Sequence, residues 1–204
     1  WQPATLRLLN GGVLGLDGQL TVDGIVHLDG GATDGGSFYL RAGALLRGQG
    51  DVNSGVVSTS DTTMEIRALG PLTLGRSDTP DGYRVDGALI IDAQTVTLRD
   101  ADSARVGSVW LAGGELVLPS GGGSVYAAGA VTGSGTIHGA LRNRGAIAAD
   151  LSPGLSFDGA VESYGRPVSG TLHFLAGSSF LGQGTLAGTI VVDAGASLSN
   201  AGVL

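Results

Sequence analysis

The chain has 204 residues, 38 of them glycine, a formal net charge of −7 at pH 7, and neither cysteine nor lysine. Without cysteine there is no disulfide or Cys-based zinc site, and without lysine there is no Schiff-base chemistry or Walker-type nucleotide site. The acidic balance disfavours nucleic acid as a partner, because phosphate binding needs clustered cations. The chain contains no run of 18 apolar residues, so no membrane-spanning helix is predicted.

Residues 6–28 alternate apolar side chains with small or polar ones and are interrupted repeatedly by Gly or Asp. This period-2 pattern predicts strands of three to five residues. Asn10-Gly11 is a strong hairpin signal, so an antiparallel start to the chain stays open as an alternative.

Three polar or glycine-rich stretches predict corners or loops. Residues 30–36 contain four glycines in seven residues, which predicts a corner or a protruding loop; the spacing of calcium-binding glycine-aspartate repeats is not present. Residues 58–63 are polar and typical of a solvated loop. Residues 77–83 place Pro80 before Asp81-Gly82 and predict a protruding turn.

Residues 89–98 (LIIDAQTVTL) are rich in β-branched side chains and predict a pair of strands, with Thr95 and Thr97 facing outward. Asp100 and Asp102 follow and would share one side of a continuing strand. They are the best candidates for an acid/base pair or a calcium site. No third or fourth carboxylate accompanies them, so a solvated corner is the preferred interpretation.

The remaining candidate side chains are scattered along the chain. His27, His138 and His173 have neither metal-ligand nor catalytic-triad spacing, and no Gly-x-Ser-x-Gly elbow precedes a helix. Four aromatic residues are expected to pack in the core or on the sheet surface rather than to bind sugars. These residues are Trp110, Tyr126, Phe174 and Phe180. We therefore predict no catalytic residue, no cofactor and no metal site.

Internal repeats organise the sequence. In residues 133–159 (GSGTIHGALRNRGAIAADLSPGLSFDG), short apolar segments are separated by Gly, Asn and Ser-Pro-Gly. This pattern predicts short strands joined by tight corners rather than a helix. Their opening pattern, G-x-G-x-[VIL], also occurs in residues 48–57 and 182–191. In addition, LRNRGAI of residues 141–147 matches LSNAGVL of residues 198–204. Such self-similarity predicts stacked repeats.

The second repeat makes a residue-level prediction. Asn143 precedes Arg-Gly and Asn200 precedes Ala-Gly in matching positions, so we expect them at equivalent turns. Asn can adopt the left-handed conformation there and bond its own backbone. Ile147 and Leu204 are expected to point inward.

These motifs carry a resemblance to a known group of proteins. GSGTIHG, LRNRGAI and SPGLSFDG resemble the passenger and autotransporter-associated β-strand repeats of exported Gram-negative bacterial proteins, many of which carry a C-terminal sorting tail. Segments of residues 72–116 resemble the longer repeat found in the same proteins, and the likeness covers roughly two thirds of the chain. The resemblance implies a secreted β-solenoid and transfers no catalytic residue.

We therefore expect one all-β domain over residues 1–204, a right-handed parallel β-solenoid (β-helix) with irregular coils, within a longer exported chain. A β-sandwich or jelly roll is the alternative fold. The expected function is that of a non-enzymatic extracellular structural or adhesive protein at the cell surface. Two alternatives stay open: a glycan- or ion-binding module of a larger surface protein, and a carbohydrate-active β-helix.

Self-association end to end is expected, because a solenoid leaves unpaired strand edges on its first and last coils. Both termini are apolar, and lysine, a common edge-blocking residue, is absent. The expected partner is therefore another copy in a head-to-tail contact, with glycans or another surface protein as further candidates. The residues expected to make the contact are Leu6, Leu8, Leu198, Val203 and Leu204.

Overall fold

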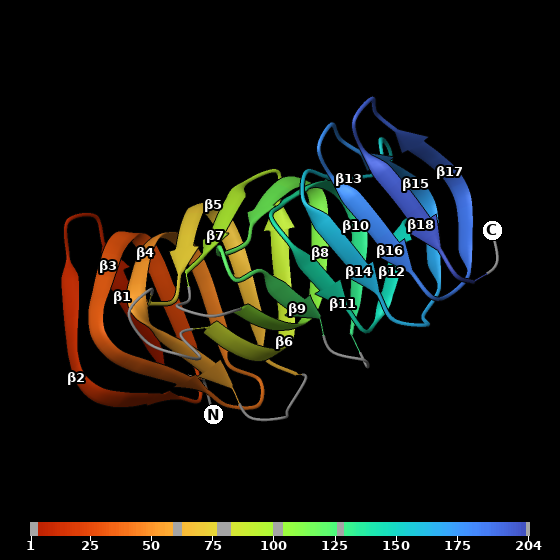
Figure 1. The fold of residues 1–204 in the computed structure, drawn as a ribbon. Coiled ribbons are helices and arrows are strands. Elements are labelled where there is room, and N and C mark those ends of the chain that lie inside the picture. The colour runs from red at the N-terminus through yellow and green to blue at the C-terminus, as the bar shows by residue number, and fades with distance from the viewer. Residues whose placement is uncertain (1–3, 59–62, 77–82, 100–103, 126–128, 203–204) are drawn as a thin grey trace.

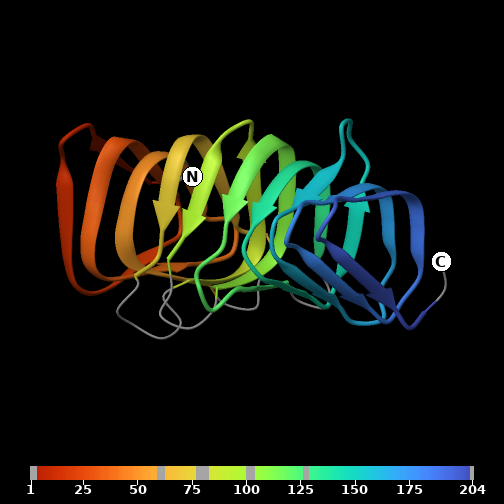
Figure 2. The same ribbon diagram turned by 45° about the horizontal axis from the view of Figure 1, so that its top comes forward.

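The computed structural model describes residues 4–58, 63–76, 83–99, 104–125 and 129–202. In these residues the chain is a parallel β-solenoid of about nine turns, with β1 and β2 at one end and β17 and β18 at the other (Figure 1 and Figure 2). Every strand pairing described is parallel, so the antiparallel sandwich or jelly-roll alternative is wrong. None of these residues forms a helix long and apolar enough to cross a membrane.

The strands follow one another around the coil. The first nine are β1 (Thr5–Leu9), β2 (Val13–Val22), β3 (Ile25–Leu40), β4 (Leu45–Ser58), β5 (Glu65–Leu74), β6 (Tyr83–Asp92), β7 (Thr95–Leu98), β8 (Ala104–Val117) and β9 (Gly123–Val125). The others are β10 (Ala130–His138), β11 (Leu141–Asn143), β12 (Ala146–Ala149), β13 (Leu155–Phe157), β14 (Ala160–Ser163), β15 (Val168–Phe174), β16 (Ser179–Gly182), β17 (Leu186–Val192) and β18 (Ser197–Asn200).

Strand β3 makes one whole turn and defines the three faces of the coil. Its residues 25–29, 32–34 and 37–40 each pair with a segment of β4, and the register shifts between them mark two corners. We call the faces that contain these three segments A, B and C, and we use the same names for the segments stacked on them in other turns. One turn takes about 20 residues, as the pairing of Thr5 with Ile25 shows.

The core consists of inward apolar side chains stacked from turn to turn. On face A these side chains form one column, which we call the main column, and every member except the first, Leu6, is at most 3% exposed. Each such side chain contributes about 1.5–3 kcal/mol on burial, which offsets the backbone entropy of a glycine-rich chain. The column is Leu6, Val26, Leu46, Ile66, Leu89, Val109, Val131, Ile147, Val168 and Leu186.

Glycine occurs where the chain passes very close to the preceding turn. Gly48 has φ +125°, and a Cβ there would lie 1.8 Å from the carbonyl oxygen of Leu28. Gly133 has φ +101°, and a Cβ there would lie 1.9 Å from the carbonyl oxygen of Leu111. Both belong to one column of face A, so these two copies of the glycine pattern are equivalent. The third copy begins at Gly182 on face C, so its likeness in sequence is not a structural repeat.

The glycine-rich residues 30–36 do not protrude, contrary to one of the two expectations for them. They stay within β3, where positive φ angles at Gly30, Gly35 and Gly36 turn the corners. The interior position between those corners is taken by Thr33, which is 1% exposed and shares a hydrogen bond of 2.9 Å with Ser54 on the next turn. A polar pair inside the coil therefore replaces the apolar side chain that the sequence lacks here.

The Asn10-Gly11 hairpin is also wrong. Gly11 has φ +76° and the amide of Gly12 donates to the carbonyl of Leu9, so the chain turns a corner there. β1 and β2 then both pair with β3 and not with each other. Parallel stacking is favoured because it turns Leu6 and Leu14 toward the same interior.

The other predicted strands and loops lie only partly within the residues that the structure describes. Residues 89–98 form the end of β6 and all of β7, with Val96 and Leu98 buried and the threonines outward as predicted. Residues 59–62 and 77–82 lie outside the described residues. Tyr83, expected in a protruding turn, instead begins β6 and is fully buried, because it stacks on Val56 of face C.

Asn143 and Asn200 occupy one column of face C, as predicted from the repeat. Successive pairings connect Asn143 to Ser163, Gly182 and Asn200. Neither Asn has a positive φ, so the expected left-handed conformation is wrong. The buried carboxamide of Asn143 instead bonds Gly145 in both directions, Nδ2 to O at 2.6 Å and N to Oδ1 at 3.3 Å. Ile147 is 1% exposed, as expected, and Leu204 lies outside the described residues.

We predict that Asn143→Ala lowers the free energy of unfolding by about 1–3 kcal/mol, because it leaves buried backbone groups of Gly145 without partners. Ser163→Ala is the matched control in the same column, since Ser163 Oγ is buried and has no hydrogen-bond partner. It should be neutral or stabilising. Urea unfolding followed by circular dichroism measures both, and equal losses would contradict the assignment.

Candidate functional site: the open ends of the solenoid

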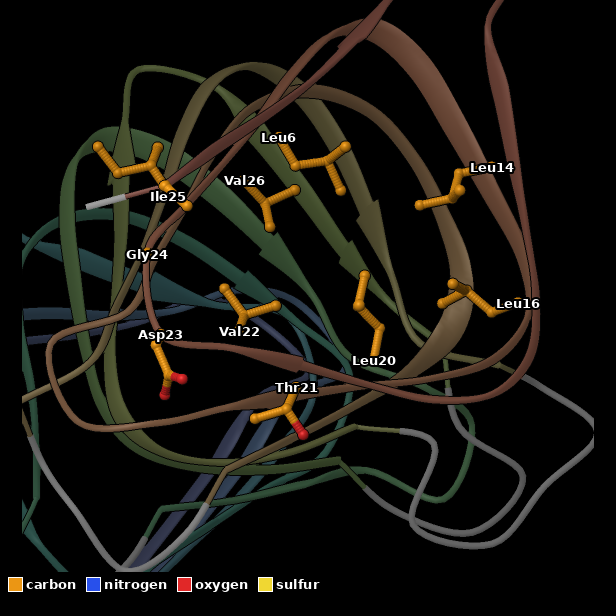
Figure 3. Close-up of a pocket in the computed structure, with 11 residues that line it drawn as sticks. Leu6, Leu14, Leu16, Leu20, Thr21, Val22, Asp23, Gly24, Ile25 and Val26 are labelled. Atoms are coloured by element: carbon orange, nitrogen blue, oxygen red, sulfur yellow. The ribbon is translucent and has the colours of Figure 1, made fainter. Parts of the chain in front are cut away.

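The N-terminal end of the coil is an open apolar hollow. Its volume is about 410 Å³, and Figure 3 shows the side chains of Leu6, Leu14, Leu16, Leu20 and Val26 around it. The four leucines are only partly buried. By contrast, Val26, Thr33 and Phe38, which pair with Leu6, Leu14 and Leu20 one turn further in, are buried. The first turn therefore leaves core surface uncovered.

The C-terminal end is open in the same way. Its hollow of about 660 Å³ is lined by Leu186, Ile190, Val192 and Leu198, together with small residues of β17. Val192 is 43% exposed, although Phe174 directly beneath it is fully buried. Stacking by a further turn would bury Val192 as Val192 buries Phe174.

Backbone groups are also unpaired at both ends. β1 and β2 pair only with β3, β17 pairs only with β15, and β18 pairs only with β16, within the described residues. In a parallel ladder successive N–H groups point to opposite sides, so about half of those in a terminal strand face outward along the axis. Such edges can accept a further strand.

The sequence identified part of these surfaces. Leu6 and Leu198 line the two hollows, and Leu8 packs partly buried against the core beside Leu6. Val203 and Leu204 lie outside the described residues. Other apolar lining residues were missed, among them Leu14, Leu16, Leu20, Ile190 and Val192. The alternation of the three leucines with small or polar residues indicated strands. Only the stacking order shows that all five residues belong to terminal turns.

The histidines do not converge on a catalytic set. His27 lies on face A, and the other two lie on face B, each beside an aspartate of the next turn. His138 Nδ1 is 2.6 Å from Asp158 Oδ2, and His173 Nε2 is 2.7 Å from Asp193 Oδ1. All four side chains are between 33% and 39% exposed, so these are surface pairs of small energetic weight.

The other candidates give no active site in the described part of the chain. Asp100, Asp102 and Tyr126 lie outside it, and its His, Asp and Glu residues form no group of three suited to a metal. Phe174 and Phe180 are buried as expected, and Trp110 lies on the sheet surface. Burial raises the pKa of Tyr83 well above its ordinary value, so its hydroxyl stays neutral near pH 7.

No family model matches the chain, and no match was found among curated proteins or solved structures.

We predict that the terminal strands exchange amide hydrogens faster than the central ones in dilute solution, because half of their N–H groups lack a partner strand. Peptides from β2 and β17 should exchange faster than peptides from β4 and β8, which are paired on both sides. Hydrogen-exchange mass spectrometry at two protein concentrations measures this. Uniform exchange along the coil would contradict open ends.

Proposed function

We propose that this protein is a non-enzymatic extracellular structural protein whose solenoids stack head to tail into a filament, matrix or surface layer. The observation that carries the proposal is an open apolar hollow with unpaired strand edges at each end of the coil that the described residues form. A hydrophobic core cut open at two opposite surfaces is stabilised when a second surface of the same kind covers it.

The two ends are complementary in register. Leu6 begins the main interior column of face A and Leu186 ends it, so the first turn of one copy can continue the last turn of another. Because the contact joins different ends, each added copy presents a new open end. A head-to-tail contact of this kind does not close and gives a filament.

The sequence patterns support a location outside the cell. The glycine patterns resemble repeats of exported bacterial passenger proteins, and the parallel solenoid is consistent with that resemblance. We extend the proposal to membership of this group of surface proteins. A chain without cysteine also needs no particular redox environment to fold.

We predict that Leu6→Glu and Leu198→Glu each prevent assembly when tested alone, because each places a charge in one hollow. Mixed in equal amounts, the two variants should form dimers and nothing larger, since one intact end remains on each. Analytical ultracentrifugation and electron microscopy measure the species. Circular dichroism checks that both variants stay folded.

Thr97→Glu is the control, because it adds the same charge on the side of the coil rather than at an end. It should assemble as the unmodified chain does. A mixture of the two end variants that stays monomeric would refute the head-to-tail contact, and so would dispersed monomers of the unmodified chain at micromolar concentration.

The non-enzymatic part of the proposal has its own test. We predict that Asp100→Asn together with Asp102→Asn leaves biological activity and assembly unchanged, because no other acid, base or metal ligand is identified to act with them. Digestion assays on a polysaccharide panel, with and without calcium, measure this. Cleavage by the unmodified chain that is lost in the folded double variant would support the carbohydrate-active alternative.

A further inference from the structure

One column of outward side chains on face A is basic near the N-terminal end and apolar beyond it. Its members occupy six consecutive turns and are directly paired in the ladder, so neighbouring Cα atoms lie about 4.8 Å apart. In order they are Arg7, His27, Arg47, Arg67, Ile90 and Trp110.

The period of the strands fixes this orientation. On either side of Arg47, Leu46 and Gly48 are buried, and the same alternation holds for Arg67 between Ile66 and Ala68. Consecutive side chains of a strand point to opposite sides, so the arginines point outward. All members point to the lateral surface of the coil; Arg7 belongs to the terminal strand β1, and Arg47, Arg67 and Trp110 lie further in, away from the N-terminal hollow.

The positive charge of this column is only partly neutralised. Arg7 Nη2 lies 2.7 Å from Asp29 Oδ2, and Arg67 Nε lies 3.3 Å from Glu65 Oε1 without the alignment of a hydrogen bond. Arg47 stands between them with no ion pair or hydrogen bond to any described residue, and its Nε is buried. Like charges directly opposite on neighbouring strands are destabilising, so Arg47 beside Arg67 is a position that an anion would stabilise.

The column continues into an exposed aromatic surface. Trp110 is 37% exposed and follows Ile90, which is half-buried. A tryptophan ring on a flat sheet offers a large rigid apolar surface at low entropic cost. Beyond Trp110 the column holds Thr132 and Ala148, which are too small to cover it.

We propose that this column binds an acidic polysaccharide that runs along face A parallel to the solenoid axis. The planar guanidinium of arginine matches a carboxylate or sulfate with two hydrogen bonds. Arginines on the first, third and fourth turns of one column suit a polymer with repeated anionic groups. A sugar ring packs on Trp110. Nucleic acid fits the column less well, because duplex DNA carries one charge per about 1.7 Å of its axis, whereas the members of the column are about 4.8 Å apart.

The test uses Trp110 as its reporter. Trp1→Phe leaves Trp110 as the one tryptophan of the chain. Alginate oligomers, which carry carboxylates, and heparin, which carries sulfates, are titrated at low salt, with neutral dextran as the comparison. We expect one or both acidic polymers to change Trp110 emission and to bind more weakly as salt rises. Neutral dextran should leave the emission unchanged. The stronger of the two identifies the anionic group.

Arg47→Gln in this background should weaken binding about tenfold, the loss of one charged hydrogen-bonded contact. Because Arg47 forms no ion pair or hydrogen bond with the residues that the structure describes, its replacement should not lower thermal stability. Arg105→Gln is the matched control: it removes the same charge from an exposed position on face C and should change affinity less than about twofold.

Four results would overturn the proposal. They are no binding of either acidic polymer at low salt, equal binding of dextran, equal losses in Arg47→Gln and Arg105→Gln, and binding of single-stranded DNA as tight as that of the acidic polymers. Binding here is measured on monomers carrying Leu198→Glu, so it does not depend on assembly.

Discussion

The stacking of each inward apolar side chain over its equivalent in the next turn is the constraint on which the structure depends. A single turn has no core of its own, because its apolar residues meet only when further turns cover them. Residues such as Ile66 and Leu89 are therefore buried by neighbours in the column as much as by their own turn. Stability is distributed along the coil, and it falls off where the stacking stops.

The same register accounts for the ends and for the lateral surfaces. Where stacking stops, Leu16 and Val192 remain uncovered and strand edges are unpaired. Along the sides, register turns residues about 20 positions apart into neighbours, so Arg47 and Arg67 form part of a continuous column. Extended surfaces of this kind suit polymeric partners better than a compact catalytic pocket, which needs several groups converging on one point.

Two departures from an all-apolar interior are matched by hydrogen-bond partners, whereas the buried Ser163 Oγ has none among the described residues. Thr33 bonds Ser54 on the next turn, and Asn143 bonds Gly145 across its own corner. Buried polar groups are tolerated when they find partners, and here those partners fix the corners. Glycines such as Gly48 serve the close approach of successive turns, where any Cβ would collide with a carbonyl.

The sequence by itself determined the fold class, the parallel stacking, the inward position of Ile147 and the equivalence of Asn143 with Asn200. Period-2 alternation indicated strands, and the repeated motifs, with the resemblance that they carry, indicated stacked equivalent turns. It misjudged residues 30–36, since glycine and aspartate indicate a bend without saying whether the chain leaves the coil there. Only the tertiary structure decided which glycine repeats are equivalent, which leucines lie in a terminal turn, and which arginines stand side by side. The number of residues per turn varies along the chain. Residues of different turns can therefore be matched only when the strand pairings of all the turns between them are known.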